Sequence, residues 1–417
     1  MSSLRVILYA FVVCFCLPTQ ISGILGQSGG FEDQKFNLLQ MKESLKYNPA
    51  YSSKLTHWNR TTDCCQWAGV SCDSHGAAVA LDLSDESIVD GLDHSAALTT
   101  LTSLQSLDLS GNFFITQKIP SSIFKLTALT ELNLASTNLS GPINESLTNL
   151  RFLSKLRLDG NFFLTPIPLF FANFTNMKWM HLNNSFWVGE FPEAIFHMKS
   201  LQLITVKENR ELRGKLPEFH LNSSIEQMVV TGTKFGGIIP NSIGKLPLMN
   251  LKLGECRFTG EIPKSLFNLS GLKVLELQQN NLTGFLELDW IIHLPNLLSL
   301  SLSDNLLTVK ANSLRLDQLR YLELNHCNMT NFPFLSNQSV LEILFLRDNR
   351  LQGSIPSSLP TTLILLDLSE NNFTSSIPED LGNLTSLFLL RLHTNGLNGE
   401  IPSALCNAFS LTSLSLG

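Results

Sequence analysis

The stretch "LDLSGN", residues Leu107 to Asn112, sets a frame that returns along most of the 417-residue chain. Two leucines flank one polar residue, and an asparagine follows five places after the first leucine. Successive side chains of a strand point to opposite faces, so each frame predicts a short strand with its two apolar residues turned inward. The frames recur at intervals of about 24 residues, as a repeat array requires. Their first apolar residues are Leu81, Leu107, Leu132, Leu156, Met180, Ile204, Met228, Leu251, Leu275, Leu300, Leu322, Leu344, Leu366, Leu390 and Leu414.

In most frames a small polar residue or a cysteine stands five places after the first apolar residue. We call this the ladder position and expect its side chain to bond backbone groups that the turning chain leaves unpaired. The pattern resembles the leucine-rich repeat, whose consensus has Asn or Cys here. The resemblance implies an α/β solenoid, a right-handed superhelix with a concave parallel β-sheet. The ladder residues are Asn112, Thr137, Asn161, Ser185, Asn209, Thr233, Cys256, Asn280, Asn305, Cys327, Asn349, Asn371 and Asn395.

An x-G-x-I-P element follows the ladder position in many units, as in "TGEIP" ending at Pro263 and "QGSIP" ending at Pro356. It resembles the plant-specific class of leucine-rich repeats found in receptor kinases, receptor-like proteins and polygalacturonase-inhibiting proteins. The units that begin at Leu275 and Leu300 lack the element. We therefore expect a local departure from the regular superhelix in those two units.

The first residues predict export and a cap. Residues 1–23 have the features of a secretory signal peptide, with Arg5 before an apolar run and a small residue at its end. We expect an N-terminal cap over 24–78 and about 14 repeat units over 79–417, the last one incomplete. The first unit of a solenoid needs a cap with a polar outer face. A helix over 33–46 is predicted to supply it, with apolar positions at Phe36, Leu38, Leu39, Met41 and Leu45.

The cap contains "HWNRTTDCCQWAGVSCD", which resembles the N-terminal cap of plant receptor-like proteins, the wilt-disease-resistance type in particular. That family has a further cysteine before the cap helix, where this chain has Gly30. The resemblance therefore implies a Cys65–Cys72 disulfide and leaves Cys64 without its usual partner. A zinc site is not favoured, because no second C-x-x-C or His pair stands at ligand spacing.

The other cysteines and the sequons fit an exported repeat protein. Cys256 and Cys327 in the ladder, and Cys406 on the convex side, are predicted to be buried structural thiols. Asn-x-Ser/Thr triplets are dense, which indicates a glycosylated outer surface. The candidate glycosylation sites are Asn59, Asn138, Asn144, Asn173, Asn183, Asn222, Asn268, Asn281, Asn328, Asn337, Asn372 and Asn383.

Composition and motifs favour binding over catalysis. The net charge of -6 argues against a nucleic-acid partner, which would need clustered Lys and Arg. The sequence contains no H-E-x-x-H or P-loop motif, so we expect no enzyme activity and no cofactor or metal. An extended concave surface suits a large ligand.

The resemblance implies a receptor-like protein that recognises an extracellular peptide or protein. Such a protein would take part in plant immune or defence signalling through co-receptor or adaptor kinases. The repeats still run at Gly417, so we expect the N-terminal part of such an ectodomain. A full-length receptor would lie on the outer side of the plasma membrane, whereas a chain ending at Gly417 would be secreted to the apoplast. The alternative is a secreted inhibitor or decoy resembling polygalacturonase-inhibiting proteins.

Two clusters on the predicted concave face stand out against the small or acidic residues that occupy most of it. Exposed Trp, Tyr and Arg together are typical of binding hot spots. The alternative is that Trp179 packs against Phe186 or Trp187 and that the charges pair only with one another. The first cluster is Lys155, Arg157, Asp159, Trp179 and His181, and the second is Arg320, Tyr321, Glu323, Phe345 and Arg347.

Overall fold

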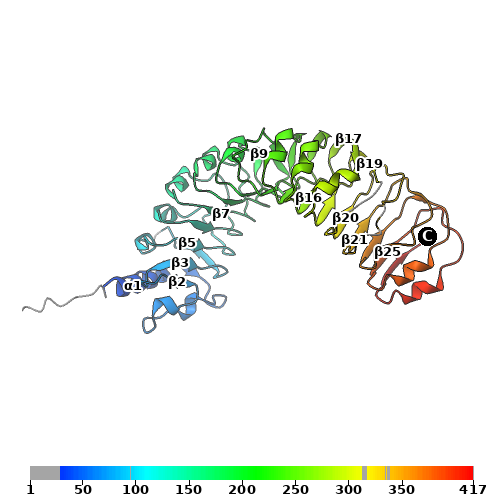
Figure 1. Cartoon of the computed structure of the whole chain (residues 1–417). Coiled ribbons are helices and arrows are strands. Elements are labelled where there is room, and N and C mark those ends of the chain that lie inside the picture. The colour runs from blue at the N-terminus through cyan, green and yellow to red at the C-terminus, as the bar shows by residue number, and fades with distance from the viewer. Residues whose placement is uncertain (1–28, 94, 312–316, 334, 336–338, 417) are drawn as a thin grey trace, which may run out of the picture.

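The repeat frames form the inner lining of a curved solenoid (Figure 1). The computed structural model describes residues 29–93, 95–311, 317–333, 335 and 339–416. The predicted signal peptide and the sequon at Asn337 lie outside these residues. One sheet of sixteen strands follows the arc, and all its pairs are parallel except the first, β2 with β3. The strands are β2 (Val70–Cys72), β3 (Ala78–Asp82), β5 (Ser106–Asp108), β6 (Glu131–Asn133), β7 (Lys155–Arg157), β8 (Trp179–His181), β10 (Leu203–Thr205), β12 (Gln227–Val229), β14 (Asn250–Lys252), β16 (Val274–Glu276), β18 (Ser299–Ser301), β20 (Tyr321–Glu323), β21 (Ile343–Phe345), β23 (Leu365–Asp367), β25 (Leu389–Arg391) and β26 (Ser413–Ser415).

The register of this sheet confirms the predicted frame. Leu81 pairs with Leu107 and Leu107 with Leu132, and the first apolar residues stay aligned to the pair Leu390 and Leu414. From Leu81 to Leu390 these side chains are at most 1 % exposed. Each apolar stripe therefore packs on the next, and burial of a leucine side chain stabilises the fold by about 1.5–3 kcal/mol.

The ladder position performs the predicted bonding. Asn280 Nδ2 donates to the carbonyls of Leu253 at 2.8 Å and Leu277 at 3.1 Å, and its Oδ1 accepts from the amide of Phe258 at 2.9 Å. Asn112 bonds the corresponding groups near the N-terminus. One side chain thus joins two successive turns whose backbone groups are buried, which is why the position admits few residue types.

A second sheet borders the first. Its six strands lie in the order β19-β17-β15-β13-β11-β9, away from the inner side of the arc (Figure 1). The units from Leu275 and Leu300, which were expected to depart from the superhelix, contribute β17 and β19 to this sheet. Their inner strands β16 and β18 pair in register in the first sheet, and β17 pairs in register with β19 in the second. The difference in these units is local: β17 is longer than the other strands of this sheet, and the sheet ends at β19. The strands are β9 (Val188–Glu190), β11 (Glu211–Gly214), β13 (Lys234–Ile238), β15 (Arg257–Glu261), β17 (Asn281–Glu287) and β19 (Leu306–Lys310).

Short 3-10 helices and two small strand pairs complete the array. The pairs are β1 (Lys46–Tyr47) with β4 (Ile88–Asp90) and β22 (Gln352–Gly353) with β24 (Asn372–Phe373). The 3-10 helices are η1 (Leu55–His57), η2 (Cys64–Gln66), η3 (Leu98–Thr100), η4 (Ser121–Lys125), η5 (Glu145–Asn149), η6 (Leu169–Asn173), η7 (Glu193–His197), η8 (Asn241–Lys245), η9 (Lys264–Asn268), η10 (Leu288–His293), η11 (Glu379–Asn383) and η12 (Ser403–Asn407).

The cap helix α1 (Gly29–Ser44) closes the N-terminal end. Leu38 and Met41 are fully buried, as predicted, and Leu45 is buried just beyond the helix end. Phe36 was wrongly placed on the buried face: 57 % of it is exposed. No helix in the described part of the chain has the length and apolar character that a bilayer-spanning segment needs.

Candidate ligand-binding site on the concave face

Strands β7 and β8 bring the first predicted cluster together. Lys155 pairs with Trp179 and Arg157 with His181 in the parallel register, and Asp159 follows two residues after β7. The four strand residues line a hollow of about 390 Å³ that also contacts Asp108 and Glu131 on the preceding strands. Trp179 is 40 % exposed. Four of the five predicted residues therefore share one open cavity on the concave surface, and Asp159 lies outside its lining.

Each cation of this first cluster has an acidic neighbour. Lys155 Nζ lies 2.5 Å from Glu131 Oε1 and 4.4 Å from the centre of the Trp179 ring. Arg157 Nε lies 3.5 Å from Asp159 Oδ2. Ion pairs at this degree of exposure contribute about 0–1 kcal/mol, so an incoming carboxylate can replace the acidic partner at low cost.

Trp179 does not make the ring contacts that would hide it. Phe186 instead stacks on Phe162 with ring centres 5.6 Å apart, and Trp187 stacks on Phe163 at 4.2 Å. The Trp179 ring is therefore held by Lys155 alone among the aromatic and cationic contacts of the described residues. An exposed indole beside a cation offers a ligand both apolar area and charge.

The pKa of the His181 imidazole lies below its ordinary value of 6.5, so the ring is mainly neutral at pH 7. Burial lowers the pKa of its imidazole most, nearby Arg157 lowers it further, and the Asp159 carboxylate opposes both. A neutral imidazole can both donate and accept a hydrogen bond. The hollow therefore combines two fixed cations with a neutral polar ring.

The second predicted cluster also comes together, on β20 and β21. Tyr321 and Phe345 form an edge-to-face pair with ring centres 6.3 Å apart. The Tyr321 hydroxyl donates to Glu323 at 3.0 Å, and Arg347 pairs with Glu370 at 2.7 Å. Burial raises the pKa of Tyr321, and the Glu323 charge adds to it.

Arg320 of this cluster pairs with Glu342. The polar groups of the second cluster are thus largely satisfied within the chain, and its aromatic rings contact each other. The first cluster offers the more accessible combination of ring and charge, so it is the stronger candidate.

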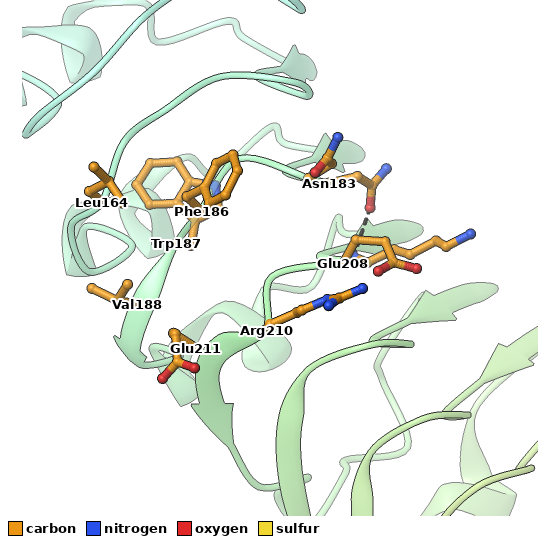
Figure 2. A pocket seen from close by; sticks show the side chains of 10 residues that line it. Leu164, Asn183, Phe186, Trp187, Val188, Glu208, Arg210 and Glu211 are labelled. Atoms are coloured by element: carbon orange, nitrogen blue, oxygen red, sulfur yellow. Dashed lines mark hydrogen bonds between the residues drawn. The ribbon is translucent and has the colours of Figure 1, made fainter.

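A larger hollow, of about 700 Å³, lies on the lateral surface between the turns that follow β8 and β10 and the strands β9 and β11 (Figure 2). None of its lining residues belongs to either predicted cluster. The sequence analysis missed it, because its walls are built from residues next to the ladder position rather than from the strands themselves.

A second polar ladder was also missed, three places after the first apolar residue. Asp159 Oδ1 accepts from the amide of Asn183 at 3.1 Å, and Asn183 Oδ1 accepts from the amide of Lys207 at 2.8 Å. Asn325 does the same for Arg347 at 2.8 Å. Asp159 and Asn183 therefore join successive repeats, whatever else they contact.

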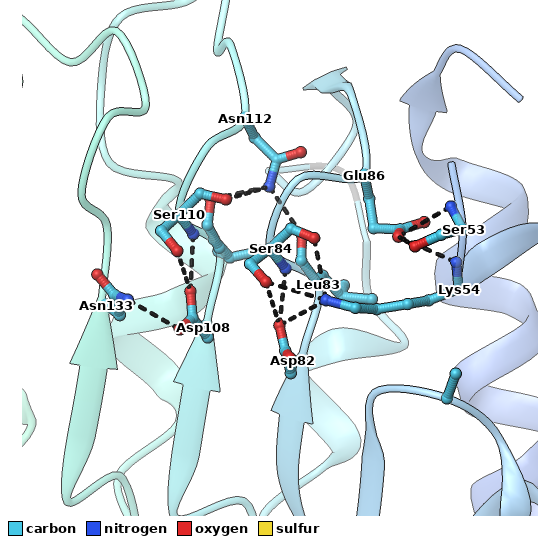
Figure 3. A network of polar contacts seen from close by, with 12 residues as sticks. Ser53, Lys54, Asp82, Leu83, Ser84, Glu86, Asp108, Ser110, Asn112 and Asn133 are labelled. Atoms are coloured by element: carbon cyan, nitrogen blue, oxygen red, sulfur yellow. Dashed lines mark hydrogen bonds and ion pairs between the residues drawn. The ribbon is translucent and has the colours of Figure 1, made fainter. Parts of the chain in front are cut away.

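Glu86 occupies the ladder position of the first frame, a substitution that the sequence analysis overlooked. It is fully buried, and its carboxylate accepts from the backbone amides of Ser53, Lys54 and Leu55 at 3.0–3.1 Å and from the hydroxyls of Ser52 and Ser53. Figure 3 shows this carboxylate beside Lys54, whose ammonium group reaches Asp82 and Ser84. Burial raises the pKa of Glu86, but these donors lower it by more. A ladder residue thus fastens the cap to the first repeat.

The cysteines follow the expectations with one clear exception and one partial departure, since Cys256 is only partly buried. Cys65 and Cys72 form a disulfide, and Cys64 is free and buried. Cys327 is buried in the ladder, where burial raises the pKa of its thiol, and Cys256 is partly buried with a similarly raised pKa. Both thiols stay protonated and donate to backbone carbonyls.

Cys406 is the exception, because it is exposed and not buried as predicted. It lies in η12, where the neighbouring Leu405 takes the inward position. Asp63, Cys64 and Cys65 approach within 4.8 Å of one another, a spacing that suits a metal ion. The disulfide removes the Cys65 thiolate, however, which leaves this group with too few ligands for zinc.

Most sequon asparagines that the structure describes lie at the surface. Nine of these asparagines are exposed and two, Asn138 and Asn183, are partly exposed. Asn183, at the rim of the concave strands, uses its Oδ1 for the second polar ladder. The exposed sequon asparagines are Asn59, Asn144, Asn173, Asn222, Asn268, Asn281, Asn328, Asn372 and Asn383.

Comparison with known families matches the cap and the repeats. Residues 31–73 match the leucine rich repeat N-terminal domain, and residues 247–307 match a leucine rich repeat model. A further leucine rich repeat model matches 103–126, 128–150, 340–361 and 362–384.

Sequence relatives are plant proteins. Receptor-like protein 6 of Arabidopsis thaliana is 33 % identical over 236 residues, which cover 48 % of this chain and 24 % of the relative. Receptor-like protein 9DC1 of Solanum pimpinellifolium is 31 % identical over 295 residues, covering 61 % and 32 %. The matched segments therefore span about a quarter to a third of the length of these relatives.

Solved structures share the fold. A TDR receptor aligns over 79 % of this chain and 58 % of its own, with a TM-score of 0.70 and 28 % identity. The Arabidopsis receptor kinase HAESA, solved with the peptide hormone IDA and the co-receptor SERK1, aligns over 92 % and 89 % with a TM-score of 0.59 and 22 % identity, which shows the fold alone. The chain thus has the leucine-rich repeat fold, and the relatives it resembles in sequence are plant receptor-like proteins.

Proposed function

We propose that this chain is the extracellular recognition part of a plant receptor-like protein, and that it binds a peptide or protein ligand in the concave hollow of the first cluster. The observation that carries the proposal is the position of Trp179, exposed between Lys155 and His181 in an open cavity. Rings and cations of this kind carry much of the energy of protein interfaces.

The proposal assigns a role to each side chain. Trp179 supplies apolar contact area, and Lys155 and Arg157 attract carboxylates of the ligand. His181 forms a hydrogen bond with a polar group of the ligand, as a donor or an acceptor, because its imidazole is neutral. Binding without catalysis is part of the proposal. So is signalling through co-receptor or adaptor kinases in plant defence, for which the HAESA complex with its co-receptor is a precedent on the same fold.

The test compares ligand capture by matched double variants of the secreted, glycosylated chain. Peptides from plant and pathogen extracellular fluid are captured on the wild type and identified by mass spectrometry. We expect Trp179→Ala with Arg157→Ala to lose the captured set. The control is Arg151→Ala with Phe152→Ala, which removes the same chemistry from an exposed arginine and a 60 % exposed ring outside the hollow. Equal capture by both double variants would refute the assignment of the site.

A further inference from the structure

The lateral hollow has two chemically different walls (Figure 2). One wall is apolar and consists of Leu164, Phe186, Trp187 and Val188. The opposite wall is charged and includes Lys207, Glu208 and Arg210 from the turn after β10. A cavity with a large apolar wall and a few converging polar groups is the usual form of a ligand site.

The apolar wall contains exposed side chains that lie next to one another. Leu164 is 67 % exposed and Phe186 is 49 % exposed, and Phe186 stacks on Phe162, itself 48 % exposed. Phe162 and Phe186 each follow the ladder residue of their unit, where later units have polar residues such as Arg210 and Asn281. The repeat does not require aromatic rings at this place. A contiguous apolar patch of this kind marks an interaction surface.

Trp187 adds an independent sign of a missing partner. Its side chain is fully buried at the hollow and stacks on Phe163, yet its indole Nε1 has no hydrogen-bond acceptor among the described residues. A buried Trp N–H normally finds an acceptor, because leaving it unpaired costs about 1–3 kcal/mol. Because this nitrogen is itself buried, an oxygen of an occupant reaches it only when neighbouring side chains of the wall move aside.

The charged wall contains two cationic side chains that, among the described residues, are not paired with an acid. Within the described part of the chain, Lys207 and Arg210 make no ion pair, whereas Lys234 of the next unit is paired with Glu211 at the floor of the hollow. Arg210 and Lys207 are exposed. The one remaining acid of this wall, Glu208, leaves an excess of positive charge. The wall is therefore complementary to a carboxylate.

We propose that the lateral hollow binds an extended peptide segment of a partner protein in which a large apolar side chain stands next to an acidic residue. The apolar side chain packs against Phe186 and Leu164, and the carboxylate pairs with Arg210 across the hollow. This site shares no lining residue with the concave hollow, so it adds a second recognition surface beyond the proposed ligand site.

The probe for this site is a displayed library of random linear peptides, selected on the intact chain after enzymatic removal of N-glycans, because the sequon residue Asn183 lines the hollow. We expect enriched peptides that combine an aromatic or aliphatic residue with a neighbouring Asp or Glu. Their affinity should fall by about tenfold or more for Arg210→Glu, because that change sets like charges against each other. It should fall similarly for Phe186→Ser, which removes an exposed ring without disturbing a buried one.

The decisive experiment reverses the charges of both the peptide and the chain. Peptides rewritten with Lys in place of the acidic residue should bind Arg210→Glu and not the wild type. The double variant Trp179→Ala with Arg157→Ala should bind the library peptides normally, so a failure of the concave site leaves this test intact. The proposal is overturned if enrichment shows no acidic preference, if Arg210→Glu binds equally well, or if sedimentation shows that Phe186→Ser abolishes self-association and a second copy is the occupant.

Discussion

The junction between cap and solenoid should depend on the charge of Glu86. Replacing Glu86 by Gln preserves its size and shape but exchanges one carboxylate oxygen for an NH2 group. The carboxylate now accepts five hydrogen bonds from residues 52–55, including the buried amide of Leu55. The new NH2 group would face amide and hydroxyl donors, so at least one donor would be left without an acceptor.

The expected loss of free energy that stabilises the cap junction is large for a single side chain. A hydrogen bond to a charged group contributes about 1.5–3 kcal/mol, and an unpaired buried donor costs about 1–3 kcal/mol. We therefore expect the cap junction to lose about 3 kcal/mol, which raises the equilibrium constant for its local opening about 100-fold. Repeat proteins open locally at their ends, so the effect should stay close to the cap.

Hydrogen exchange measured by mass spectrometry locates this effect. Peptides covering residues 52–57 should exchange about 100-fold faster in Glu86→Gln, while peptides from the central repeats keep their rates. Glu400→Gln, at an exposed position, is the matched control. Unchanged exchange at 52–57, or an equal change in the control, would refute the reasoning.

Lowering the pH should remove the stabilisation that the Glu86 carboxylate gives the cap junction of the wild type. The native pKa of Glu86 is depressed, so its stabilisation is fully present above the ordinary value of 4.5 and is lost as pH falls through the native pKa. The difference in exchange between the wild type and Glu86→Gln should therefore shrink below pH 4.5. A difference that persists in acid would show that the carboxylate charge is not its cause.

Three further outcomes follow from other residues. Cys64 should react with iodoacetamide only after unfolding, whereas exposed Cys406 reacts in the native protein; peptide mapping distinguishes them. Asn280→Ala should accelerate local proteolysis, with a loss of about 2–4 kcal/mol from its broken ladder bonds, and exposed Asn281→Ala should not. The His181 imidazole should titrate below its ordinary 6.5 in an NMR pH series, because burial disfavours its charged form; a midpoint at or above 6.5 would contradict this.

The sequence predicted the fold down to the strand register, since periodicity constrains every unit in the same way. Leu81 and the fourteen later first apolar residues align as expected because each must lie over its neighbour. The ladder was predictable for the same reason. The exceptions are local. Phe36 stands two residues before buried Leu38, so its side chain leaves the opposite face of the cap helix. Cys406 lies in η12, outside the strand frame, and its side chain is exposed.

The candidate site was predictable only in part. Strand register placed Lys155, Arg157, Trp179 and His181 side by side, because a position in the frame fixes the direction of the side chain. The lateral hollow could not be found in this way, since Leu164 and Arg210 lie in turns whose shape depends on the neighbouring repeat. A sequence signal did exist: Phe162 and Phe186 stand directly after the ladder position in two adjacent units, where most later units have a polar residue.

The second polar ladder limits which members of the first cluster can serve ligand recognition alone. Asp159 holds the amide of the next repeat, so a substitution there changes the spacing of two strands as well as the charge of the hollow. Arg157 and Trp179 make no such backbone contact with their side chains among the described residues. Loss of binding in Arg157 or Trp179 variants therefore reports on the surface itself, whereas loss in an Asp159 variant reports on the scaffold too. That distinction is why the double variant of Arg157 and Trp179, and not one that includes Asp159, is the informative test.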